Sequence, residues 1–148
     1  MQEMQGDILN VTSGIICHQV NCRGVMGAGL ALDIRNKWPV VANDYFAQHN
    51  STGVHLGDII ISHVDKVNDL YVVSLAGQDQ FGKGMIFTKY NAVRTCLAKV
   101  NYWNGRKHVI YIPVGMSCGL AGGDWDTVVG IIAMVIPNAV LVNRGAIT

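Results

Sequence analysis

Short apolar runs rich in β-branched residues alternate along this chain with longer segments in which apolar residues recur every three or four positions. The short runs predict strands, one ending at residue 5 and the others covering 15–19, 58–64, 70–75, 108–113 and 139–142. The longer segments predict helices over 28–37, over 40–49, between 88 and 104, and over 124–136. The order β-β-α-α-β-β-α-β-α-β predicts an α/β fold in which helices cover both faces of a mixed six-stranded sheet.

Individual residues mark where these helices begin and end. Trp38-Pro39 is expected to end the first helix, because proline cannot continue a helix and restricts the residue before it. Thr88 is predicted to cap the N-terminus of the third helix and Asn104-Gly105 to end it. Asp124 is predicted to cap the fourth helix, where its charge suits the positive end of the helix dipole.

Composition narrows the function classes. A chain of 148 residues fits one domain, and a hydrophobic content of 50% with 14% charged residues argues against disorder. The net charge of +1 and the lack of a basic stripe predict neither a nucleic-acid patch nor a membrane surface. No apolar run has the length of a membrane span and no signal peptide is recognised, so we expect a cytoplasmic protein, and we expect it to be a monomer.

The cysteines do not form the paired spacing of a zinc site. Cys17, Cys22, Cys96 and Cys118 lack Cys-x-x-Cys pairs, which predicts small, buried, reduced side chains. A site built from Cys17, His18 and Cys22 is disfavoured because no second ligand pair is visible. We therefore expect no metal and no cofactor.

Two glycine-rich loops carry the strongest chemical pattern. Residues 21–31 and residues 115–123 each lie between a predicted strand and a predicted helix. Glycines there leave backbone N–H groups uncovered, and the positive end of the following helix points at the same place, which favours phosphate. Neither loop has Walker or dinucleotide-fingerprint spacing, and tight turns with close helix packing are the alternative. Two such loops together favour a ligand with two phosphates or a pyrophosphate.

Four motifs then carry a family resemblance. They are Gly6-Asp7-Ile8-Leu9, the segment from His18 to Leu30, Leu56-Gly57-Asp58, and the segment from Ser117 to Trp125. In this order, and at these element boundaries, the chain resembles a macrodomain, a family that binds ADP-ribose or a relative. The resemblance implies a three-layer α/β/α macrodomain with a central mixed six-stranded sheet, and a single macrodomain over residues 1–148.

The branch of the family that the chain resembles most contains ADP-ribose 1″-phosphate phosphatases and terminal ADP-ribose glycohydrolases. The glycohydrolases use a Lys after the fourth strand, where this chain reads Leu75-Ala76-Gly77-Gln78-Asp79. Their partner Asp corresponds to Ala121 here. Lys83 lies nearby between glycines and is expected to be solvated. Both halves of the covalent mechanism are therefore missing from the expected positions.

The resemblance assigns ligand contacts residue by residue. Asp7 and Ile8 are expected at the adenine and Asn21 at the distal ribose, whereas a turn-forming Asp7 and an Asn21 bonded to its own loop are the alternatives. The remaining expected contacts come from the two loops and are Gly27, Ala28, Gly29, Leu30, Ser117, Cys118, Gly119, Leu120, Ala121 and Gly122.

His18 is the candidate acid–base residue, because imidazole titrates near neutrality, and Asp79 is a weak candidate to support it. A strand histidine satisfied by backbone is the alternative. Three functions stay open: hydrolysis of the phosphate of ADP-ribose 1″-phosphate without a metal, reading or sequestering ADP-ribose derivatives without turnover, and glycohydrolysis by a substrate-assisted water. The expected partner is ADP-ribose or a derivative, either free or attached to a macromolecule.

Overall fold

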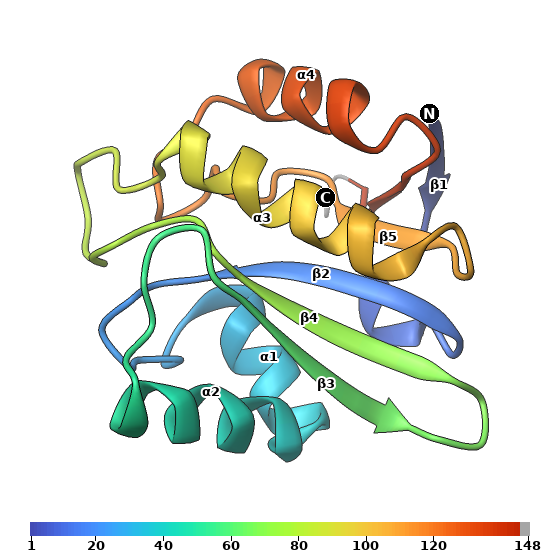
Figure 1. Ribbon diagram of the computed structural model, residues 1–148. Helices are drawn as coiled ribbons and strands as arrows, with labels where there is room; N and C mark the ends of the chain where they lie inside the picture. The colour runs from blue at the N-terminus through green and yellow to red at the C-terminus, as the bar shows by residue number, and fades with distance from the viewer. Residues whose placement is uncertain (146–148) are drawn as a thin grey trace.

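The chain forms one six-stranded sheet with helices on both faces (Figure 1). The computed structural model describes residues 1–145. The strands are β1 (Gln2–Gln5), β2 (Gly14–Val20), β3 (Ile59–Asp65), β4 (Leu70–Ala76), β5 (Ile110–Pro113) and β6 (Val140–Asn143). The helices are α1 (Gly29–Lys37), α2 (Pro39–Ser51), α3 (Tyr90–Asn104) and α4 (Trp125–Val135), with a 3-10 turn η1 at Ile8–Asn10. The predicted order of elements and the α/β/α architecture are confirmed.

The direction of the strands decides where the loops emerge. The sheet order is β1-β6-β5-β2-β4-β3, and every neighbouring pair is parallel except β3 with β4. The carboxyl ends of β2, β4 and β5 therefore lie along one edge of the sheet, at the left in Figure 1. Figure 1 also shows α3 and α4 on one face and α1 and α2 on the other.

The central strand β2 is buried on both faces. Ile15 and Cys17 pack with α3 and α4, whereas Ile16 and Val20 pack with α1 and α2. This is why the strand reads as a continuous apolar run instead of an alternating one. None of the helices within residues 1–145 is both long and apolar enough to cross a bilayer.

Three of the four predicted helix ends are confirmed and one is wrong, and α1 ends at Lys37 before Trp38-Pro39 as expected. Asp124 caps α4, since its Oδ2 accepts the N–H of Thr127 at 2.9 Å, and Gly105 ends α3 in the left-handed conformation at φ +53°. Thr88 does not cap α3. The capping position is Lys89, without a side-chain hydrogen bond, and the hydroxyl of Thr88 instead donates to Ser117 O at 2.7 Å. The Thr88 hydroxyl therefore bonds to a residue distant in sequence, and not to the helix N-terminus that the local pattern predicted.

His18 lies inside the fold. Its side chain is 1% exposed, and its Nε2 lies 2.8 Å from Ser74 Oγ in the neighbouring strand β4. Its Nδ1 is buried without a hydrogen-bond partner within residues 1–145. Burial disfavours the charged imidazolium and lowers the pKa of His18 to about 4.

This burial predicts a pH-dependent loss of stability. In the unfolded chain His18 takes up its proton near pH 6.5, but in the folded chain only near pH 4, so acidification through this interval favours unfolding. The contribution should be complete above pH 6.5 and fall by on the order of 3 kcal/mol towards pH 4. Urea unfolding of the wild type and of His18→Gln at several pH values measures it, because glutamine donates to Ser74 but does not titrate. Parallel stability curves for the two proteins would contradict this prediction.

Candidate functional site

Both glycine-rich loops leave the same edge of the sheet. The first loop (residues 21–28) follows β2 and leads into α1, and the second loop (residues 115–123) follows β5 and leads into α4. Because β2 and β5 are adjacent and parallel, their loops emerge side by side. This is the position at which open α/β sheets bind ligands.

The first loop is held in shape by Asn21. Its Nδ2 donates to Val25 O at 2.8 Å, and its Oδ1 accepts the N–H of Arg23 at 2.9 Å. The alternative assignment, an asparagine bonded to its own loop, is therefore confirmed. Contact of Asn21 with a ribose stays a prediction.

Two side chains from α2 support the first loop from below. The hydroxyl of Tyr45, which is fully buried, donates to Asn21 O at 2.6 Å and accepts the N–H of Gly24 at 3.0 Å. A Cβ on Gly24 would lie 2.6 Å from the ring of His49, and φ there is +76°, so only glycine fits. Neither of these contacts was predicted from the sequence.

The backbone N–H groups at the end of the first loop have no hydrogen-bond acceptor within residues 1–145. The backbone N–H groups of residues 27–31 donate to no other group within residues 1–145, and Ala28, the N-cap residue of α1, makes no side-chain capping bond. A Cβ on Gly29 would meet nothing within 4 Å. These donors lie at the positive end of α1, which suits an anion.

Some backbone N–H groups of the second loop are hydrogen bonded within the loop, and others have no acceptor in the described part of the chain. Cys118 N donates to Gly115 O at 3.0 Å and Gly122 N donates to Gly119 O at 3.1 Å, so these two expected phosphate donors are used within the loop. The N–H groups of residues 119–121 donate to nothing within the described part of the chain. A Cβ on Gly119 would also meet nothing within 4 Å.

Ser117 is tied to the neighbouring strand. It adopts φ +73°, a left-handed conformation that is uncommon outside glycine, and its hydroxyl donates to Gln19 Oε1 at 2.5 Å. The side chain expected at the pyrophosphate is therefore bonded to Gln19, a residue that the sequence did not single out.

Asp7 lies at the same edge of the sheet, after the parallel strand β1. Its Oδ1 accepts the N–H of Leu9 at 2.9 Å and caps η1, and its Oδ2 lies 3.7 Å from Arg144. The turn-forming alternative is thus confirmed, and adenine contact stays a prediction. The neighbouring Ile8 is 5% exposed and packs in the core beside α1 and α2.

The segment after β4 braces the first loop. Asp79 pairs with Arg23 at 3.3 Å, with both side chains about half exposed, and its carbonyl accepts the N–H of Cys22 at 3.0 Å. Asp79 therefore pairs with the first loop and not with His18, whose buried ring lies against Ser74. Nothing in this geometry gives His18 access to a ligand.

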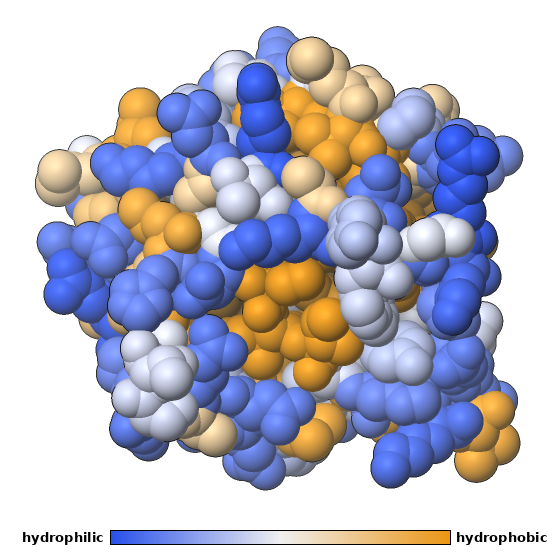
Figure 2. Space-filling view, in the orientation of Figure 1, coloured by the Kyte–Doolittle hydropathy of each residue, from blue (hydrophilic) through white to orange (hydrophobic). Residues whose placement is uncertain are grey.

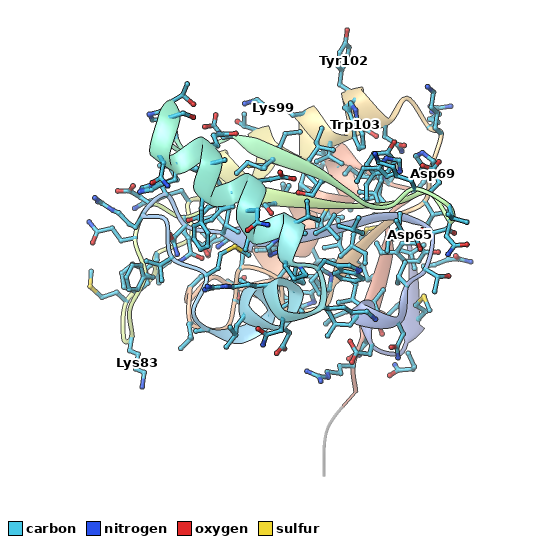
Figure 3. The ribbon with its side chains drawn as sticks, turned by 90° about the horizontal axis from the view of Figure 1, so that it is seen from below. Asp65, Asp69, Lys83, Lys99, Tyr102 and Trp103 are labelled. Atoms are coloured by element: carbon cyan, nitrogen blue, oxygen red, sulfur yellow. The ribbon has the colours of Figure 1, made fainter. Side chains whose placement is uncertain are left out.

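Residues 81–88, which we call the covering segment, lie against the second loop. Phe87 N and Thr88 N both donate to Ala121 O, at 2.8 and 3.2 Å. The segment projects at the loop end of the molecule, where Figure 2 shows apolar residues among polar ones. Its exposed apolar side chains are Phe81, Met85 and Ile86, and Leu120 of the second loop is exposed as well. Lys83 points away into solvent, as expected (Figure 3).

The cysteines are free thiols, and burial raises the pKa of each of them. No cluster of three His, Cys, Asp or Glu side chains that could hold a metal ion occurs within residues 1–145.

Comparison with known proteins identifies solved structures that share this arrangement. No protein-family model matches the chain, and no curated protein matches it. Among solved structures it is similar to a protein of unknown function from Bacteroides thetaiotaomicron, with 31% identity over 96% of each chain and a TM-score of 0.85. It is similar to a macrodomain protein from Streptomyces coelicolor, with 26% identity over 98% of this chain and 99% of that one and a TM-score of 0.78. It also matches Thermosipho africanus DarTG in complex with ADP-ribose, with 16% identity over 99% of this chain and 43% of that one and a TM-score of 0.78.

The strand order, the two N–H-lined loops at adjacent strand ends and the match to the Streptomyces protein over nearly the whole of both chains agree. We conclude that the chain has the macrodomain fold.

Proposed function

We propose that this chain binds ADP-ribose or a derivative by holding the pyrophosphate between its two loops. The observation that carries the proposal is the set of backbone N–H groups in residues 27–31 and 119–121 that have no acceptor within residues 1–145. They lie at adjacent carboxyl ends of parallel strands, and two helix dipoles point to the same edge. Concave arrays of backbone N–H groups are anion sites, and a diphosphate carries an anion for each loop.

The comparisons support the choice of ADP-ribose over other diphosphates. The Thermosipho structure, which shares the fold, contains ADP-ribose. In the assignment proposed here, Asp7 accepts a hydrogen bond from the adenine amino group. One carboxylate oxygen holds the η1 turn, and the other, which lies 3.7 Å from Arg144, has a further lone pair for an N–H donor. Residues 27–30 and 119–121 contact the pyrophosphate, and Asn21 lies beside the distal ribose with one amide hydrogen left to donate.

Burial of His18 supports binding without turnover. An acid–base group must reach the substrate, but this imidazole is 1% exposed and hydrogen bonded to Ser74. The positions of the glycohydrolase pair are held by Gly77-Gln78 and Ala121, which supply neither a nucleophile nor a carboxylate. We therefore place the reader or sponge function ahead of the phosphatase, which stays a prediction for assay.

A carboxylate introduced into the second loop should abolish binding. Gly119→Glu has room for its side chain, yet sets a negative charge beside the pyrophosphate, so ADP-ribose affinity should fall at least about 100-fold. The control is Gly130→Glu on α4, where a Cβ also meets nothing within 4 Å. Isothermal titration calorimetry on both folded variants measures the difference. Equal affinities for the two variants would remove the second loop from the site.

The adenine contact can be tested through the amino group itself. Asp7→Ser keeps a side-chain oxygen to cap η1 but is too short to reach the base. The wild type should prefer ADP-ribose to inosine diphosphate ribose, which lacks the amino group, by roughly tenfold or more. Asp7→Ser should bind the two ligands alike. A preference that survives in Asp7→Ser would show that another residue reads the base.

Turnover is tested by incubating the protein with ADP-ribose 1″-phosphate, ADP-ribosylated protein and ADP-ribosylated DNA. We expect the protein to bind ADP-ribose but to release neither phosphate nor ADP-ribose faster than the uncatalysed reaction does. The reason is that the candidate acid–base group, the His18 side chain, is buried away from the ligand. Phosphate release by the wild type that drops roughly 10²–10⁴-fold in a folded His18→Gln protein would establish the phosphatase instead.

A further inference from the structure

We propose that Gln19 is the positioning residue that holds the second loop in the shape that receives the ligand. This inference rests on the function proposed above and deepens it, since it assigns what fixes the geometry of the free N–H groups in residues 119–121. It comes from a ring of hydrogen bonds between three chain segments that are far apart in sequence.

The ring joins Gln19, Thr88 and Ser117. Ser117 Oγ donates to Gln19 Oε1 at 2.5 Å, Gln19 Nε2 donates to Thr88 Oγ1 at 3.0 Å, and Thr88 Oγ1 donates to Ser117 O at 2.7 Å. Thr88 is 3% exposed and Ser117 7% exposed, so these bonds are largely shielded from water. Hydrogen bonds in such surroundings are strong, and the loss of one partner leaves another polar group unsatisfied.

The conformation of Ser117 explains why the second loop needs this ring. A φ of +73° brings the Cβ of an ordinary residue close to its own backbone, so the residue relaxes unless its surroundings hold it. The ring holds Ser117 by its hydroxyl and by its carbonyl, and the same carbonyl accepts the N–H of Gly123 at 2.9 Å. Ser117 comes just before residues 119–121, so its backbone angles set the direction of their N–H groups.

Gln19 acts through Ser117 and not on the ligand. Its amide oxygen accepts the Ser117 hydroxyl, and its amide hydrogens go to Thr88 and to Gln78 Oε1, the latter at 2.9 Å. The amide is thus committed on both its oxygen and its nitrogen, which leaves no donor for a phosphate.

The segment after β4 is shaped around this side chain. A Cβ on Gly77 would lie 2.3 Å from Gln19 Oε1 and 2.9 Å from Val93 Cγ2. Gln78 both accepts from Gln19 and donates to Gln80 O at 2.7 Å. The residues that stand where the related glycohydrolases carry their Lys are therefore occupied in making room for Gln19 and bonding to it. A Lys placed at Gly77 would displace Gln19 before it reached the ligand.

The experiment compares ADP-ribose affinity in four proteins by calorimetry: the wild type, Gln19→Leu, Gln19→Leu with Ser117→Gly, and Gln2→Leu. Leucine fills much of the space but breaks the ring, so affinity should fall at least about tenfold. Glycine adopts φ +73° freely and has no hydroxyl to leave unpaired, so the double variant should recover most of that loss. Gln2→Leu, the same change at an exposed glutamine of β1, should bind as the wild type does.

The backbone amide resonance of Gly119 in a ¹⁵N-correlated spectrum gives a second readout. It should move in Gln19→Leu without ligand and return towards its original position in the double variant, which a general loss of stability does not produce. If Gln19→Leu does not fold, Thr88→Val breaks the ring from the other side and is measured in its place, with the same expected loss and rescue.

The outcomes separate the two proposals. A wild type that fails to bind ADP-ribose overturns the proposed function, and the present inference with it. A wild type that binds, with a folded Gln19→Leu protein that binds within about twofold of it, overturns only the role of Gln19. A loss that Ser117→Gly does not restore overturns the claim that Gln19 acts through Ser117.

Discussion

The parallel pairing of β2 with β4 on one side and β5 on the other fixes where everything else in this molecule lies. Because these strands are parallel, their carboxyl ends lie at the same edge of the sheet, and a loop follows each of them there. Parallel neighbours must also be joined by crossover connections. The helices of the crossovers then cover both faces of the sheet, which forces β2 to be apolar along its buried length. The site follows from this topology, because the edge collects loops that are distant in sequence.

The site that we propose is made largely of main chain. Its donors are backbone N–H groups that the protein does not use, and side chains matter where they hold the backbone in place, as Asn21 and Tyr45 do for the first loop. An anion bound in this way is recognised by shape and dipole, without a cationic side chain. This agrees with a chain whose net charge is only +1.

Local patterns predicted the elements of this fold because each pattern reflects burial or a nearby hydrogen bond. Strand and helix order follow from hydrophobic period, and the Asp124 cap bonds a residue three positions away. The two loops were recognisable because glycines gather at two strand-to-helix turns, where they leave backbone N–H groups uncovered.

Side chains whose partners lie far along the chain were not predictable in the same way. Thr88 resembles a helix cap until a carbonyl 29 residues away takes its hydroxyl, and Gln19 meets Ser117 98 residues further on. The titration chemistry of His18 suggested a catalytic residue, but the register of β2 turns its ring into the core beside Ser74. Residue type thus indicates which chemistry a side chain can perform, whereas its tertiary contacts determine whether that side chain is accessible and unbonded in the folded protein.

The close fit of Gly77 against Gln19 couples these two positions. A side chain at residue 77 would need the space that the Gln19 amide occupies, so the amide would have to move. The hydrogen bond from the Ser117 hydroxyl to Gln19 would then be lost. Space for a side chain at residue 77 and a fixed second loop are thus alternative uses of one small volume at the edge of the sheet.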